Sequence, residues 1–252
     1  MLFQLLFLFM VGAVGGWVIE LFFRRFFSMK KWINPGFLNG PYLPMYGVGT
    51  LLLYGACFIP LPKWALVLLL LFALTALEYV TGLIFIKGLK IKLWDYSNRR
   101  GNIQGIVCPL FSLLWGLIAA GFVYLLFSPL HTAAQWAAES AWMHFFNGAF
   151  YGVFFVDLCI SFNVSLKIRK AAAQLKEAVH YEQLKASLNE WRAEHRQKRR
   201  FLFPFAGASF LDAVRDLHAR SMERLRSLKG RRKGGKNGAE QDRQDPPADR
   251  ED

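Results

Sequence analysis

Long apolar runs dominate the first two thirds of the chain. A helix needs about 20 apolar residues to cross the roughly 30 Å hydrocarbon layer of a bilayer. Five runs of about this length contain neither Lys nor Arg, and they cover residues 2–23, 43–60, 64–86, 107–127 and 142–165. The pattern predicts an all-α, polytopic membrane protein with five transmembrane helices in a domain over residues 1–165. The second run is the shortest, because Pro44 and Pro60 bracket it.

The basic side chains between these runs predict the orientation of the protein. Nine of them lie in segments 24–42 and 87–106, whereas the turn before the third run has only Lys63 and segment 128–141 has none. Cytoplasmic loops carry the excess of Lys and Arg in membrane proteins. We therefore expect a multi-pass protein of the plasma membrane with its N-terminus outside, both basic loops in the cytoplasm, and a cytoplasmic C-terminus.

Composition separates the membrane domain from the rest of the chain. The chain is 54% hydrophobic, against about 45–50% in soluble domains, which excludes a soluble fold for the first two thirds. Residues 1–165 contain ten basic and five acidic side chains, and the remainder contains 21 and 13. The apolar periodicity of residues 166–229 predicts cytoplasmic amphipathic helices, which either pair as a hairpin or lie on anionic lipid. Residues 230–252 are charged and rich in Gly and Pro, which predicts a disordered tail.

A short motif occurs twice, which suggests a duplicated two-helix hairpin. Asn39-Gly40-x-x-x-Pro44 leads into the second run, and Gln104-Gly105-x-x-x-Pro109 leads into the fourth. Each motif follows a run that contains one glutamate. Parallel repeats of this kind occur in transporters. The alternative is that Gly and Pro are common where helices begin.

Three acids lie within the apolar runs and form the candidate polar site: Glu20, Glu78 and Asp157. An ionised side chain at the bilayer centre costs roughly 2.5–3.5 kcal/mol, so each acid needs a partner or a function. Glu20 continues a stripe of Gly12 and Gly16 that favours close helix contact, and a salt bridge to Arg24 would explain it. Glu78 and Asp157 each lie eight residues before the inner end of their run. We expect these two acids to coordinate an ion or substrate or to relay protons. The alternative is that they form structural hydrogen bonds between helices.

Small residues also suggest how the last run packs. Gly148-x-x-x-Gly152 is a motif typical of close contact between membrane helices. We expect the fifth helix to pack against the two hairpins through it.

The two basic loops contain the second set of candidate residues. Pro and Gly set fixed turns, Asn and Asp satisfy backbone groups locally, and aromatic residues favour the interface or re-entry between helices. We expect a cytoplasmic gate, a docking surface or a headgroup site, and the alternative is interfacial anchoring. The candidates are Asn34, Asn39, Gly40, Pro41, Trp94, Asp95, Tyr96, Arg99, Arg100, Asn102 and Gly105.

Several segments in this order carry a resemblance to a known family. They are Gly16-Trp17-x-x-Glu20, Asn34-Pro-Gly-Phe-Leu-Asn-Gly-Pro-Tyr-x-Pro-x-Tyr-Gly47, Glu78-Tyr79, Trp94-Asp-Tyr-Ser97 and the stretch from Gly105 to Gly116. Over about residues 10–165 the chain resembles the bacterial membrane proteins labelled putative ABC-transporter type IV, or putative ABC transporter permease. The resemblance implies a transporter subunit but no assigned site residues. Family members often have a basic residue where this chain has Ile106, which argues against anion binding by that loop.

Absent motifs narrow the function further. The sequence has no G-x-x-x-x-G-K-[ST], so a separate ATPase subunit would have to supply ATP hydrolysis. It has no H-E-x-x-H, G-x-S-x-G or Cys-x-x-Cys, so we expect no metal and no cofactor, and enzymatic activity is not the favoured prediction. The favoured function is a permease-like component that translocates a small substrate, alone or as a homo-oligomer. The alternatives are a scaffold or regulator that binds partners through its tail, and a lipid-headgroup enzyme. Nucleic-acid binding is not expected.

Overall fold

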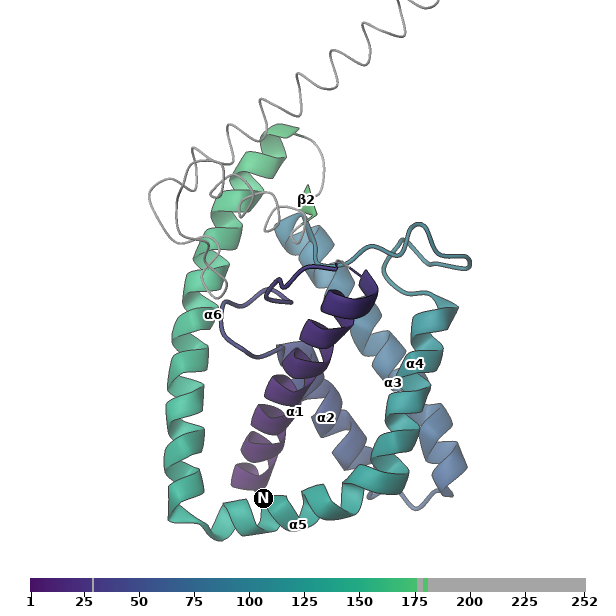
Figure 1. The fold of residues 1–252 in the computed structure, drawn as a ribbon, viewed down its shortest axis with the longest axis vertical. Helices are drawn as coiled ribbons and strands as arrows, with labels where there is room; N and C mark the ends of the chain where they lie inside the picture. The colour runs from purple at the N-terminus through teal and green to yellow at the C-terminus, as the bar shows by residue number, and fades with distance from the viewer. Residues whose placement is uncertain (29, 176–178, 181–252) are drawn as a thin grey trace, which may run out of the picture. The chain divides into compact units, whose positions relative to one another are not determined.

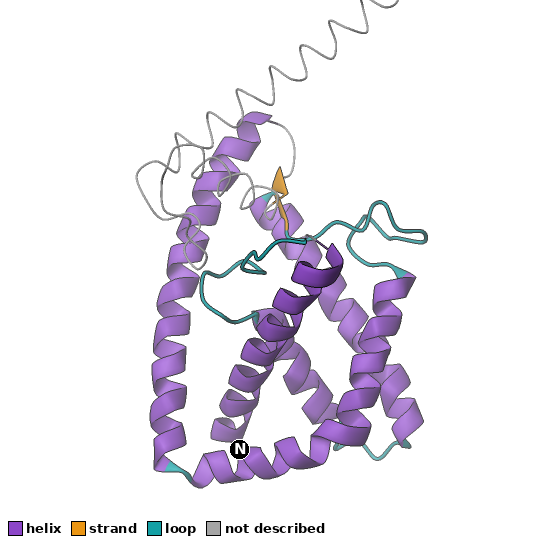
Figure 2. Ribbon diagram, viewed as in Figure 1, coloured by secondary structure: helices purple, strands orange, loops and turns teal. Residues whose placement is uncertain are grey.

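The computed structural model describes residues 1–28, 30–175 and 179–180. All of them belong to the first of two compact units of the chain, Met1–Pro204. The predicted all-α class is confirmed, since the regular elements of the described part are helices apart from two short strands (Figures 1 and 2). The elements are α1 Leu2–Phe23, η1 Arg24–Ser28, α2 Pro44–Ala56, α3 Lys63–Leu83, η2 Ile84–Leu89, β1 Ile91–Lys92, α4 Pro109–Gly121, η3 Phe122–Leu126, α5 Phe127–Glu139, α6 Ala141–Leu175 and β2 Val179–His180. The three η segments are π-helical turns, and β1 pairs in parallel with β2 over two residues.

Four helices in the described part are long and apolar enough to cross a membrane, as expected of a multi-pass membrane protein. They cover Leu2–Phe27, Lys63–Leu89, Pro109–Glu139 and Ala141–Asn163. The second expected span, residues 43–60, is not among them, because α2 has only 13 residues. Pro44 starts α2 at its first turn, and the chain leaves the helix after Ala56 for a turn that contains Pro60. The expected count of five is therefore not confirmed by helix length.

The helices run between two ends of the described bundle. At one end, here called the loop end, η1 and η2 lead into a first loop, residues 30–43, and a second loop, residues 93–108. At the other, the α5 end, α4 bends through η3 into α5, which lies across the bundle beside the N-terminus of α1 (Figure 1). Most of segment 128–141, which separates the fourth and fifth apolar runs, is therefore helical. The absence of Lys and Arg there gave no sign that this alanine-rich segment forms a helix.

An apolar core fills the α5 half of the bundle. Leu8 of α1, Tyr54 of α2, Leu70 of α3, Phe122 of η3 and Ala134 of α5 are all buried in one cluster. In contrast, the buried polar side chains lie mainly toward the loop end: Arg24, Asn34, Asn39, Glu78, Asp157, Ser161 and Ser165. Asn147, toward the α5 end of α6, is the exception.

Glycines bring α1 and α2 into close contact. A Cβ atom at Gly16 would overlap the Tyr46 ring, and one at Gly12 would overlap the Thr50 side chain. Only hydrogen fits at either position. The predicted small-residue stripe on α1 is therefore confirmed.

The second glycine motif does not pack in this way. Among the described residues, no atom outside the local backbone lies within 4 Å of the Cβ position of Gly148 or Gly152, so the expected packing of α6 through this motif was wrong. A different face of α6 meets α1: the Tyr151 hydroxyl donates to the carbonyl of Leu6 at 2.9 Å. Aromatic rings supply the contact because their size spans a wider separation than glycine allows.

Candidate functional site

Asp157, on α6, binds the first loop at the loop end of the bundle. The side chain is 5% exposed and accepts hydrogen bonds from five groups. The backbone amides of Asn39 and Gly40 donate to Oδ2 at 2.9 and 2.7 Å, and the Tyr42 hydroxyl donates to the same oxygen at 2.9 Å. The Asn39 amide group and the Ser161 hydroxyl donate to Oδ1 at 2.8 and 3.1 Å. Four of these five donors belong to the first loop, so this one carboxyl group ties the loop to α6.

The first loop re-enters the bundle to reach this carboxylate. Leu43, its last residue, donates its backbone N–H to the carbonyl of Ala13 at 2.9 Å. Ala13 lies near the midpoint of α1, so the loop descends from the end of that helix to its middle. Asn34 holds the turn closed, because its side-chain amide donates to the carbonyl of Asn39 at 2.7 Å and its Oδ1 accepts from Trp17 at 2.6 Å. Such buried backbone is tolerated at membrane depth because protein groups satisfy it.

Tyr42 closes the contact between the first loop and α6. Its ring lies 5.6 Å from that of Phe150 and 5.3 Å from that of Phe154. Burial, and next the hydrogen bond to Asp157, raise the pKa of Tyr42 well above its ordinary value. The hydroxyl therefore keeps its proton and acts as a donor to the carboxylate. Pro41, another candidate in this loop, is exposed.

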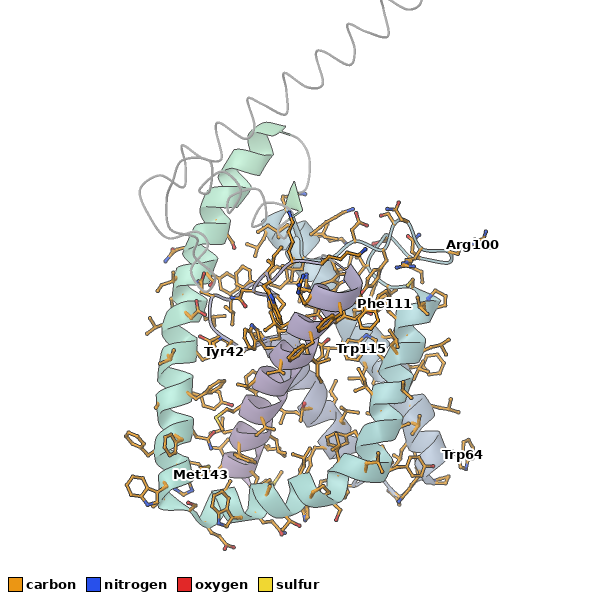
Figure 3. All side chains as sticks on the ribbon, viewed as in Figure 1. Tyr42, Trp64, Arg100, Phe111, Trp115 and Met143 are labelled. Carbon is orange, nitrogen blue, oxygen red and sulfur yellow. The ribbon has the colours of Figure 1, made fainter. Side chains whose placement is uncertain are left out.

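Glu78, on α3, binds the second loop. The side chain is 3% exposed, and the Tyr96 hydroxyl of the loop donates to its Oε1 at 3.0 Å. Its Oε2 accepts from the indole N–H of Trp115 on α4 at 3.1 Å. The Tyr96 ring stacks on Phe111 with centroids 4.3 Å apart, and Figure 3 shows Phe111 and Trp115 directed from α4 toward α1. Burial, and next the charge of Glu78, raise the pKa of Tyr96, so it too remains a donor.

Glu20, on α1, lies beside this second contact. Its Oε1 forms the predicted ion pair with Arg24 at 2.8 Å, one turn further along the helix. Its Oε2 accepts from the Tyr46 hydroxyl of α2 at 3.0 Å. The Tyr46 ring lies 5.5 Å from that of Trp115, which binds Glu78. The structure thus brings Glu20 and Glu78 into one cluster, whereas Asp157 lies with the first loop and shares no hydrogen-bond partner with either among the described residues.

The second loop is ordered by its own polar side chains. Asp95 accepts from the backbone N–H and the hydroxyl of Ser97, and Asn102 donates to the carbonyl of Ser97 at 3.2 Å. Burial alone would raise the pKa of Asp95, but the Ser97 hydrogen bonds and Lys92 lower it below the ordinary value. Trp94 donates to the carbonyl of Ile106 at 2.8 Å, which joins the beginning of the loop to its end.

The tip of the second loop presents two arginines. Gly105, with φ of +70°, donates to Asn102 Oδ1 at 3.0 Å and accepts from the backbone of Tyr96 at 2.8 Å, so the turn is closed at its base. Arg99 and Arg100 are exposed beyond it, and Figure 3 shows Arg100 at the outermost point of the loop. The loop therefore holds these charges away from the three intramembrane acids.

Sequence reasoning missed the aromatic donors that bind the acids. Tyr42, Tyr46 and Trp115 were not among the candidates, although two of them flank the start of α2. A signal was present, because tyrosine and tryptophan within a span need a partner for their polar atoms. Among the described residues, no group of three or more His, Cys, Asp or Glu side chains could hold a metal ion.

Comparison with known proteins identifies the family. The family model described as Putative ABC-transporter type IV matches residues 7–162, which is more than half of the chain. Searches of curated proteins and of solved structures each found no match. The chain belongs to the Putative ABC-transporter type IV family, which agrees with the resemblance of its loop and glutamate segments.

Proposed function

We propose that this family member is the membrane component of a transporter, which moves a small solute along a path that opens at the loop end. The observation that carries the proposal is that each loop is tied to a buried carboxylate in a membrane-spanning helix. Loops that serve only as connections do not require intramembrane acids, which are costly in lipid and are usually functional. The two contacts therefore act as latches of a gate.

The distribution of buried groups gives the direction of access. The α5 half is closed by apolar packing around Leu8, Tyr54 and Phe122, whereas Glu20, Glu78 and Asp157 all lie toward the loops. The apolar half offers a polar solute no hydrogen-bond partners and no path until the helices move. Access from the loop end, which we place in the cytoplasm because of its basic residues, is therefore the first step of transport.

A duplicated architecture supports five crossings. The two helices that follow the repeated motif, α2 and α4, both have 13 residues and both carry proline in the first turn. The helices before the motif, α1 and α3, both continue into a π-helical turn. We infer that α2 completes the second crossing together with the re-entrant first loop, which supplies the missing length. The N-terminus then lies outside and α6 runs back to the cytoplasm.

Energy for transport would come from a separate ATPase subunit, because the sequence lacks a phosphate-binding loop. The proposed roles of the cytoplasmic helices at 166–229 and the tail at 230–252 lie outside the described residues, except that α6 itself continues as a helix to Leu175. The exposed Arg99 and Arg100 provide a docking surface for an acidic partner or for lipid headgroups.

Solute profiling tests the proposal and requires no assumption about the identity of the substrate. Cells that express the wild-type protein are compared with empty cells, and each solute that changes is then measured for flux into proteoliposomes. We expect at least one solute to change in amount and to cross the vesicle membrane unaltered. Asp157→Asn should abolish the change, whereas Glu139→Gln, an exposed carboxylate on α5, should not.

Other results would replace the proposal. If purified protein chemically converts a lipid headgroup, the protein is an enzyme. If no solute differs while a variant that lacks residues 176–252 loses its cellular effect, a scaffold that acts through its tail is the correct function.

A further inference from the structure

The two acids that hold the loops differ in the kind of partners they have. Asp157 accepts hydrogen bonds from five groups, and two of these are backbone amides of the first loop. Among the residues that the structure describes, Glu78 accepts from two, through the neutral Tyr96 and Trp115 side chains, although it is 3% exposed. Burial favours the neutral form of a carboxyl group and hydrogen-bond donors favour the charged form. Glu78 therefore has fewer donors than Asp157 to offset the effect of burial.

The described groups around Glu78 supply no unbalanced positive charge to stabilise its carboxylate. The titratable and charged groups that face it come from every element packed around it: Glu20 of α1, Arg24 of η1, Tyr46 of α2 and Tyr96 of the second loop. Arg24 is paired with Glu20 at 2.8 Å, so its positive charge is largely balanced there. The remaining groups are tyrosines, which are neutral.

Protonation would change the hydrogen bonds of this carboxyl group in a defined way. In the ionised form both oxygens accept, one from Tyr96 and one from Trp115. A proton on Oε2 would face the indole N–H of Trp115, which only donates, so that hydrogen bond would be lost; a proton on Oε1 would instead reverse the bond to Tyr96, whose hydroxyl can also accept. In either case the contact between Tyr96 and the carboxyl group loses the strength that a charged acceptor provides. Tyr96 and Trp115 keep their own protons throughout.

We propose that Glu78 is a proton-binding site and that the proton releases the second loop at Tyr96. Because coupling between two binding events is reciprocal, the docked loop in turn expels the proton. The inference names the signal that opens one latch and rests on the proposed function for its biological use. It assigns the two latches different behaviour, since four groups of the first loop donate to Asp157 whereas Tyr96 alone joins the second loop to Glu78.

The internal bonds of the second loop make the release observable. Trp94 donates to the carbonyl of Ile106, and Asn102 donates to the carbonyls of Ser97 and Arg99. The loop therefore keeps its conformation when the hydrogen bond from Tyr96 to Glu78 breaks. Movement is therefore a displacement of the whole loop rather than a local loosening. A pair of probes, one on the loop and one on a helix, reports it directly.

Pulsed electron paramagnetic resonance on the full chain in nanodiscs supplies the main test. Spin labels are attached at Asn98, in the second loop, and at Lys63, at the start of α3, after the three native cysteines are replaced by serine. Both positions are exposed. We expect one narrow distance distribution at alkaline pH and a longer, broader one at acid pH. A distribution that is the same at both pH values would overturn the proposal.

Variants assign the response to Glu78. Glu78→Gln should abolish the pH dependence, Tyr96→Phe should give the released distribution at every pH, and Glu139→Gln should behave as wild type. An infrared C=O stretch of a protonated carboxyl group should form on acidification in wild type and in Asp157→Asn, but not in Glu78→Gln. A distance shift or carboxyl band that persists unchanged in Glu78→Gln would contradict the assignment.

A further variant keeps the test decisive if Glu78→Gln does not fold. Trp115→Phe removes a donor to the ionised carboxyl group, so the midpoint of the distance change should move to higher pH by about one unit. An unchanged midpoint would contradict the proposal. None of these measurements requires transport, so failure of the proton site and failure of the transporter function are separately visible.

Discussion

The two ends of the helix bundle are held together by different kinds of contact. At the α5 end, Leu8, Tyr54 and Ala134 pack in an apolar cluster that α5 covers. At the loop end, carboxylates on α3 and α6 bind loops that come from elsewhere in the chain. In lipid, helices gain no hydrophobic free energy from contact with one another. Van der Waals packing therefore holds the α5 end together, and hydrogen bonds hold the loop end together. Close packing keeps the helices in fixed positions, whereas hydrogen bonds to titratable groups can break and form again.

The largest effect should come from breaking the loop end at Asp157. In Asp157→Asn the new NH2 group would face donors, so about two charge-assisted hydrogen bonds are lost and the free energy of unfolding should fall by about 3 kcal/mol. The measurement is SDS-induced unfolding in mixed micelles. Glu139→Gln, which changes an exposed carboxylate, should have no effect. Equal stability of the two variants would mean that the first loop is not held by Asp157.

A second variant breaks the α5 end. Leu8 is fully buried, and Leu8→Ala should lower the free energy of unfolding by about 2.5 kcal/mol, near the lower end for such cavities because lipid reduces the transfer contribution. The same unfolding assay applies. We expect the two loops to keep their positions, as measured by cysteine accessibility. Exposure of both loops in this variant would show that the ends are not independent.

A third test concerns the close contact between α1 and α2. Gly16→Ala places a methyl group against Tyr46 and should cost about 2 kcal/mol, because a packed interface tolerates added atoms poorly. Gly15→Ala is the matched control, since no atom lies within 4 Å of its Cβ position. The difference between the two melting temperatures in detergent measures the packing. Similar values would place α1 and α2 further apart than described.

The polar exception at the α5 end sharpens the comparison. Asn147 is 2% exposed, and neither amide atom has a hydrogen-bond partner among the described residues. Asn147→Leu should therefore raise the free energy of unfolding by about 1 kcal/mol, since a desolvated amide is removed. Asn34→Leu, which deletes bonds to Asn39 and Trp17, should have the opposite sign. If both variants are destabilised, Asn147 has a partner that its surroundings in this chain do not reveal.

The smallest effect concerns the second loop in acid. Because the folded pKa of Asp95 lies below its ordinary value of 3.8, its carboxylate contributes stability above that value and loses it as the pH falls through the lower folded pKa. Hydrogen exchange at the Ser97 amide, corrected for intrinsic rates, should become several-fold faster over this range. Asp95→Asn should remove the pH dependence. Unchanged protection of Ser97 would show that the turn does not need the charge.

Local features of the fold were accessible from the sequence, and long-range pairings were not. The Gly12 and Gly16 stripe and the Glu20–Arg24 pair depend on helical spacing alone, so periodicity was enough to predict them. The contact of Asn39 with Asp157 joins residues 118 positions apart, and no spacing rule reaches that far. For the same reason, the equal depth of Glu78 and Asp157 gave no sign that Glu78 lies beside Glu20. The length of α2 was overestimated because apolar residues continue through the turn that ends it.

One feature of α6 links distant parts of the protein mechanically. The helix continues without a break from Ala141 to Leu175, beyond its candidate membrane span Ala141–Asn163. Asp157 sits on this same rod. A force or a torque applied to the C-terminal part of α6 would thus act on the hydrogen bonds between Asp157 and the first loop, so that an event at the end of the helix changes a buried contact far from it.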